Sequence, residues 1–157
     1  MSGSDANRSG RVFERAICAI LEASGIAFHA QYRTDYVSQL GKIIRSDVFL
    51  PRPVGFEGGL HVEARWQDSP GSADEKIYSL EKNIFTSYRR PAVVVIDGES
   101  VQPQLDYMTG LIDNKKLVAV FRLVGFMRFC GKLAGDGMVS LARREFDPNQ
   151  KTIFQVA

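Results

Sequence analysis

The sequence predicts one α/β domain, a mixed β-sheet with helices on both faces. Residues 92–96 form an uninterrupted apolar run, and the lack of alternating polar residues predicts a central strand covered on both sides. A strand over 60–67 and a helix that opens near Ser72 precede that run. This order predicts a parallel pair of strands joined by a right-handed crossover. A chain of 157 residues, 45% of them hydrophobic, suits a single domain over 1–157.

Composition limits the class of protein. The formal net charge of +2 is too small for a protein that binds nucleic acid through a strongly positive overall charge, as histones do. Any contact with nucleic acid must therefore come from a local basic patch. Cys18 and Cys130 lack metal-ligand spacing and lie in apolar surroundings, which predicts reduced thiols and no disulfide framework. The N-terminal residues do not resemble a signal peptide, and no apolar run approaches the roughly 20 residues of a membrane span. We therefore expect a soluble, cytoplasmic protein with no role in a membrane.

The N-terminal region predicts one amphipathic helix. Residues 1–9 are small and polar and are expected to be flexible, whereas 10–24 have helical periodicity that Gly25 is placed to end. Glu14 lies on the shoulder of the apolar face, where either a salt bridge at the helix edge or a role in a site accounts for it. The predicted apolar face consists of Val12, Phe13, Ala16, Ile17, Ala19, Ile20 and Ala23.

Three strands are predicted next, before the helix near Ser72. The first covers 26–36 and has one polar face, and a turn over 37–41 leads to the second, over 42–50. A loop rich in proline and glycine over 51–59 separates the second strand from the third, over 60–67.

Two carboxylates lie on either side of that loop. Asp47 is on the second strand and Glu63 on the third, so a hairpin would bring them together although they are distant in sequence. Two converging carboxylates can hold a divalent cation. An edge salt bridge with Arg45 or Arg65 is the alternative explanation, because acid-x-base patterns on strands are frequent by chance.

Alternation divides the strand over 60–67 into two faces. Trp66 lies on the apolar face, away from the acids, and is expected to be core. His61 lies on the polar face and is either structural or a participant in the site. Four polar side chains on one face predict a cleft, and they are His61, Glu63, Arg65 and Gln67.

The second half of the chain continues the alternation of helices and strands. Ser72 and Glu75 have the S-x-x-E form of a capping box, and Ile77, Leu80 and Ile84 then recur at helical spacing. The elements expected after that are a strand over 91–98, a short helix over 104–112, a buried strand over 116–123, a segment over 124–133 that is ambiguous between helix and loop, and a terminal hairpin or helix plus strand over 138–144 and 152–156.

The residues around the two acids resemble the active-site signature of the PD-(D/E)XK nuclease superfamily. That signature has an acid on one strand and acid-x-Lys on the next; here Ser46 stands before Asp47 where the motif has proline, and Arg65 follows Glu63 in place of lysine. The run over 63–76 is similar to the E-x-K-W-Q … S-G … E-E-K stretch of one branch of these nucleases. The resemblance covers roughly the first hundred residues. It implies a restriction-endonuclease-like core.

The resemblance also implies a metal site. Asp47, Glu63 and the backbone carbonyl of Ala64 would hold Mg²⁺ or Mn²⁺, which prefer hard oxygen ligands. A metal ion of this kind neutralises charge on the phosphate and supplies a nucleophilic water.

Other residues would complete the implied catalytic set. Arg65 can stabilise charge on the phosphate, but it is a poor proton acceptor because it stays charged. Lys76, in the first turn of the following helix, can supply the missing amine. Gln67 can orient the water, and Glu14 can act as a third acid.

Three functions remain open at this point. The leading hypothesis is a Mg²⁺-dependent DNA endonuclease that serves restriction, repair or phage DNA processing. The alternative is a catalytically inactive nuclease-fold module that binds DNA or a protein partner, with Arg65 marking lost chemistry. The third is a small α/β protein with a fortuitous motif, which predicts no metal binding.

No DNA-reading module is recognisable in the sequence. Such a chain would either read DNA through its own loops as a homodimer or act on DNA structure rather than sequence. Each basic cluster in the sequence is more often a solvated surface pair than a phosphate contact, although both explanations stay open. The clusters are Arg8, Arg11 and Arg15, Arg89 and Arg90, Lys115 and Lys116, and Arg143 and Arg144.

Overall fold

The computed structural model describes residues 3–67 and 74–135, which form four helices and five strands. In chain order the elements are α1 (Gly3–Ala23), β1 (His29–Val37), β2 (Ile43–Leu50), β3 (Leu60–Gln67), α2 (Asp74–Thr86), β4 (Ala92–Gly98), α3 (Gln102–Gly110), β5 (Leu117–Phe121) and α4 (Leu123–Ala134). None of the helices in these two segments has both the length and the apolar character needed to cross a membrane.

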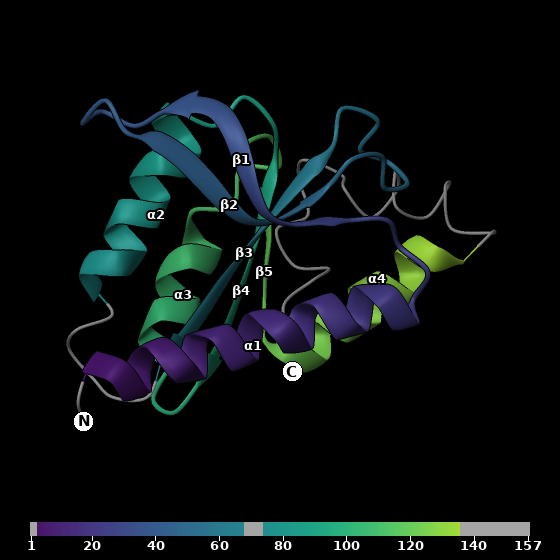
Figure 1. The fold of residues 1–157 in the computed structure, drawn as a ribbon, viewed down its shortest axis with the longest axis horizontal. Coiled ribbons are helices and arrows are strands. Elements are labelled where there is room, and N and C mark those ends of the chain that lie inside the picture. The colour runs from purple at the N-terminus through teal and green to yellow at the C-terminus, as the bar shows by residue number, and fades with distance from the viewer. Residues whose placement is uncertain (1–2, 68–73, 136–157) are drawn as a thin grey trace.

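The five strands form one mixed sheet in the order β1-β2-β3-β4-β5. β1, β2 and β3 pair antiparallel, whereas β3, β4 and β5 pair parallel. α1 and α4 cover one face of the sheet and α2 and α3 the other (Figure 1). The predicted α/β architecture and the parallel pairing of β3 with β4 are therefore confirmed.

The core has one apolar layer on each side of the sheet. β4 contributes to both layers, since Val93 and Val95 pack with α1 and α4, whereas Val94 and Ile96 pack with α2 and α3. These four side chains are at most 1% exposed, which confirms that both faces of this strand are covered. The predicted periodicity of α2 is also confirmed by its buried positions Ile77, Leu80 and Ile84.

α1 differs from the prediction at its start and in the width of its buried face. It begins at Gly3 rather than at residue 10, and Gly25 follows its end with a φ of +68°. Val12 is 58% exposed, so its assignment to the buried face is wrong. Ala19 and Ala23 of the predicted face are exposed as well, and the buried stripe recurs every fourth residue, at Phe13, Ile17 and Leu21.

The ambiguous segment over 124–133 is helical. Its residues Phe126, Phe129, Cys130 and Leu133 recur at helical spacing and are buried against the sheet. Cys130 and the half-buried Cys18 are both free thiols, as predicted. The predicted capping residue Ser72, the elements expected at 138–144 and 152–156, and the arginines at 143–144 lie outside the described residues.

Candidate active site

Asp47 and Glu63 meet where β2 separates from β3. The antiparallel pairing of these strands runs from Leu50 opposite Leu60 to Val48 opposite Val62. One residue further on, the Asp47 side chain replaces the backbone of β2 as the hydrogen-bond partner of β3. Its Oδ2 accepts a hydrogen bond from the backbone N–H of Ala64 at 2.8 Å. The separation of the strands therefore leaves the Ala64 peptide facing a carboxylate instead of a neighbouring backbone.

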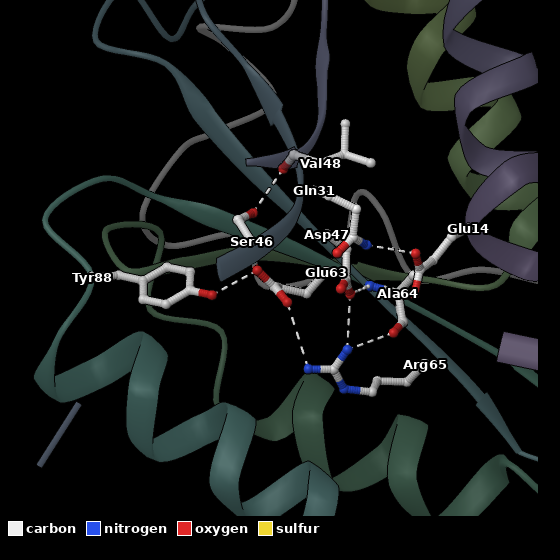
Figure 2. A network of polar contacts seen from close by, with 9 residues as sticks. All are labelled: Glu14, Gln31, Ser46, Asp47, Val48, Glu63, Ala64, Arg65 and Tyr88. Atoms are coloured by element: carbon white, nitrogen blue, oxygen red, sulfur yellow. Dashed lines mark hydrogen bonds and ion pairs between the residues drawn. The ribbon is translucent and has the colours of Figure 1, made fainter. Parts of the chain in front are cut away.

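The guanidinium group of Arg65 contacts the three oxygens that the sequence assigned to a metal ion. Its Nη1 donates to Asp47 Oδ2 at 2.9 Å and to the carbonyl oxygen of Ala64 at 2.6 Å. Its Nη2 lies 3.5 Å from Glu63 Oε2. Figure 2 shows the guanidinium group between the two carboxylates and the carbonyl. Both acids thus form an ion pair with Arg65, as the alternative explanation expected, and whether they also bind a metal ion stays a prediction.

Two acids share this one cation, and one of the acids is buried. Glu63 is 1% exposed, and burial together with the Asp47 carboxylate raises its pKa to about 8, against the opposing effect of Arg65. Although burial alone would lower the pKa of Arg65, the carboxylates of Glu63 and Asp47 outweigh it and raise that pKa above its usual range. The site therefore carries more negative charge than the guanidinium can balance when both acids are ionised.

Tyr88 is a site residue that the sequence did not reveal. Its hydroxyl donates to Glu63 Oε1 at 2.6 Å, so that the two oxygens of Glu63 have separate partners, Tyr88 for Oε1 and Arg65 for Oε2. The ring is 1% exposed and packs against His61 and Tyr36, with centroids 4.8 Å and 5.5 Å away. Tyr88 lies between α2 and β4, and no local pattern there distinguishes it from a core aromatic residue.

Glu14 lies beside the site and has a partner of its own. It is half-buried on α1, and its Oε2 accepts a hydrogen bond from Gln31 on β1 at 2.7 Å. Burial and the negative charge of Asp47 raise the pKa of Glu14, although Gln31 and Arg65 oppose the shift. Among the residues that the structure describes, no group of three or more histidine, cysteine or acidic side chains is arranged to hold a metal ion. The role of Glu14 as a third acid stays a prediction.

The polar face of β3 is mostly interior, so the prediction that its four side chains form a cleft is wrong. His61, Glu63 and Gln67 are at most 4% exposed because Tyr36, Tyr88 and helix α2 cover this part of the sheet. The His61 Nε2 lies 3.1 Å from the Tyr36 hydroxyl, and burial lowers the pKa of His61 to about 4, which favours a neutral ring. Of the four side chains, only that of Arg65 is appreciably exposed, at 28%.

The cleft lies instead at the end of β3, where residues of α1 and α2 complete its lining. It is a pocket of about 610 Å³ whose lining includes Ala64 and Arg65 from the site. Lys76, in the first turn of α2, also lines it, as its proximity to the end of the strand predicted. Gln67 is not among the described residues that line the pocket. The expectation that Trp66 is core is wrong, because Trp66 is 40% exposed and lines the pocket.

The oxygen atoms around Arg65 fit a hard divalent cation. Two carboxylates and one peptide carbonyl are the donor types that Mg²⁺ and Mn²⁺ prefer, and all three already contact one positive group. Asp47 would hold such an ion with its free oxygen or with Oδ2, and Glu63 with Oε2, since Oε1 is engaged by Tyr88. The guanidinium group and a metal ion would compete for the same oxygens.

Comparison with protein families gives one result. A family model described as a PD-(D/E)XK nuclease superfamily domain matches residues 5–129, a span that includes all but the first two residues of α1, every element from β1 to β5 and the whole pocket lining. Comparisons with curated proteins and with solved structures found no match.

Proposed function

Because the chain belongs to the PD-(D/E)XK nuclease superfamily, we propose that it is a metal-dependent nuclease that hydrolyses phosphodiester bonds in DNA. One observation carries the proposal: Asp47, Glu63 and the carbonyl of Ala64 converge on a single positive group at the wall of an open pocket. Mg²⁺ or Mn²⁺ bound to these oxygens would neutralise charge on the phosphate and lower the pKa of a water nucleophile.

The protein's own residues orient the metal-binding carboxylates and bind the phosphate. Asp47 is oriented by the N–H of Ala64, and Glu63 by the hydroxyl of Tyr88, so both carboxylates are held in place before any ligand arrives. Arg65 is a permanent forked cation that can bind two phosphate oxygens at once. Lys76 lines the same pocket and brings a second cationic group, which can donate hydrogen bonds to a phosphate.

The proposal is tested by cleavage of plasmid DNA and of circular single-stranded DNA in Mg²⁺ and in Mn²⁺. The natural protein should cut at least one of these substrates in a metal-dependent way. Asp47→Ala and Glu63→Ala should each abolish the cleavage, because each removes a proposed metal ligand. Unchanged cleavage by both variants would falsify the proposal.

A second candidate is a non-catalytic nuclease-fold module that binds DNA or a protein partner. The observation that favours it is the guanidinium group of Arg65, which already contacts all three proposed ligand oxygens. Titration calorimetry with Mn²⁺ separates the two candidates. The nuclease requires binding by the natural protein, whereas the non-catalytic module predicts binding only after Arg65→Lys, whose compact ammonium makes fewer simultaneous contacts.

A further inference from the structure

The pocket beside the site joins positive charge to an exposed aromatic ring. Three cationic residues line it, namely Arg11 from α1, Arg65 from β3 and Lys76 from α2, and they outnumber the two acids in the lining, Glu14 and Glu75. Its volume of about 610 Å³ lies in the range of pockets that enclose one small ligand or one building block of a polymer. Since Ala64 and Arg65 belong to both the pocket and the site, a group bound in the pocket lies next to the proposed metal ligands.

Trp66 forms part of the pocket wall and is exposed to solvent. It is 40% exposed although it lies on the apolar side of β3, where its neighbours in the alternation, Val62 and Ala64, are buried. Behind it lies Phe13 of α1, which is 3% exposed and has its ring centroid 5.4 Å from that of Trp66 at an interplanar angle of 52°. A core ring thus supports the indole from one side while another part of it remains accessible from the pocket.

We propose that the pocket accepts one unstacked base of a single DNA strand, with the base stacked on Trp66 and the adjacent phosphate bound by Arg65 and Lys76. The proposal rests on the proposed nuclease function and specifies its substrate as single-stranded or locally unpaired DNA. In a regular duplex the faces of the bases cover one another, and a protein meets only base edges and the backbone. An indole in a concave pocket therefore finds a base face only where a base has left the stack.

Trp66 is the only tryptophan in the chain, so tryptophan fluorescence reports on this pocket alone. The natural protein is titrated in EDTA, which prevents cleavage, with a single-stranded oligodeoxynucleotide and separately with the blunt duplex of the same sequence. Stacking of a base should quench the fluorescence with the single strand. The duplex should quench it only at concentrations about tenfold higher or more, given the contribution of base stacking on aromatic side chains.

Variants separate stacking from a general effect on the fold. Trp66→Ala should weaken binding of a dye-labelled single strand about tenfold or more, measured by anisotropy, whereas Trp66→Phe should retain most of the affinity because phenylalanine still offers a ring face. Tyr78→Ala is the matched control: Tyr78 is also an exposed aromatic residue, at 54%, but it lies outside the pocket lining. It should bind the strand as the natural protein does. Thermal unfolding of each variant verifies the fold.

Three results would overturn the proposal: equal quenching by duplex and single strand, equal affinity of Trp66→Ala and the natural protein, or no binding of the single strand. If plasmid cleavage that depends on Asp47 persists in any of these cases, the nuclease function stands and only the substrate class is wrong. Conversely, quenching by single strands in a protein that cuts no DNA would support the pocket and refute the nuclease.

Discussion

Two aspartates on strands of the same sheet each form an ion pair with an arginine at the same nitrogen–oxygen distance, but in different electrostatic surroundings. Asp47 on β2 lies 2.9 Å from Arg65, and Asp97 on β4 lies 2.9 Å from Arg122. Asp97 also accepts hydrogen bonds from the backbone N–H groups of Gly98 and Leu123, the latter at the start of α4. Partial burial opposes the effect, but these bonds and Arg122 lower the pKa of Asp97 below its usual range.

The difference between the pairs is one of charge balance. Asp97 has one cation and two N–H donors to itself, so its charge is satisfied and the pair serves to fix the N-terminus of α4. Asp47 shares its cation with the buried Glu63, whose pKa is raised to about 8, so ionising both carboxyl groups calls for more positive charge than Arg65 supplies. A short ion pair alone does not single out a site, whereas a buried carboxyl group with a strongly raised pKa beside a pocket marks a candidate.

The largest expected contrast comes from removing each aspartate in turn. Asp97→Ala should lower the free energy of unfolding by about 1–2 kcal/mol because α4 loses the acceptor at its N-terminus, while cleavage per folded molecule is unchanged. Asp47→Ala should lower cleavage per folded molecule about 100-fold or more because it removes a proposed metal ligand, and it should also cost some stability because the Ala64 N–H loses its acceptor. Denaturant unfolding and plasmid cleavage measure the two quantities. Loss of cleavage to the same extent in both variants would contradict the distinction drawn between the pairs.

Raising the pH should weaken the fold through Glu63. Its pKa is raised from an ordinary value of 4.5 to about 8, first by burial and then by Asp47. Between these values the unfolded chain gives up the proton before the folded chain does, so stability falls as pH rises, by at most about 1.4 kcal/mol per pH unit. Below this range the protonated carboxyl is accommodated in both states and the effect disappears.

Denaturant unfolding across this pH range measures that slope. Glu63→Gln should flatten it, because the amide has no proton to lose there. Asp97→Asn is the control that should leave the slope in place, since the lowered pKa of Asp97 puts its titration below the range. A slope that is as steep in Glu63→Gln as in the natural protein would show that burial of Glu63 is not its cause.

The smallest expected effect concerns the orientation of Glu63. Tyr88→Phe removes the hydroxyl that binds Glu63 Oε1 while it keeps the buried ring, so Mn²⁺ affinity should fall about tenfold. Tyr36→Phe is the matched control in the same aromatic cluster, because its hydroxyl contacts His61 instead of Glu63. Titration calorimetry compares the two variants. If they bind Mn²⁺ equally, the hydroxyl of Tyr88 does not position the carboxylate.

The parts of the site that could be predicted are those that depend on neighbouring residues in the sequence, such as alternation along a strand and the residues of a turn. β3 has the predicted bounds, Leu60–Gln67, because alternation and the turn residues before the strand are local features. The approach of Asp47 to Glu63 followed from a hairpin, and the position of Lys76 from the start of the next helix. Alternation separates the two faces of β3 but does not say which of them other elements will cover. For this reason Glu63 was predicted to line a cleft although it is buried, and Trp66 was predicted to be core although it is exposed.

By itself the sequence determined the order of the elements, the two acids on adjacent strands and the cation that follows the second acid. Only the tertiary structure decided that Arg65 would contact both acids and the Ala64 carbonyl, that Tyr88 would bind Glu63 from 25 residues away, and that the open pocket would lie beside Trp66. The physical reason is that periodicity and turns depend on neighbouring residues, whereas burial and electrostatic balance depend on which distant segments pack against them.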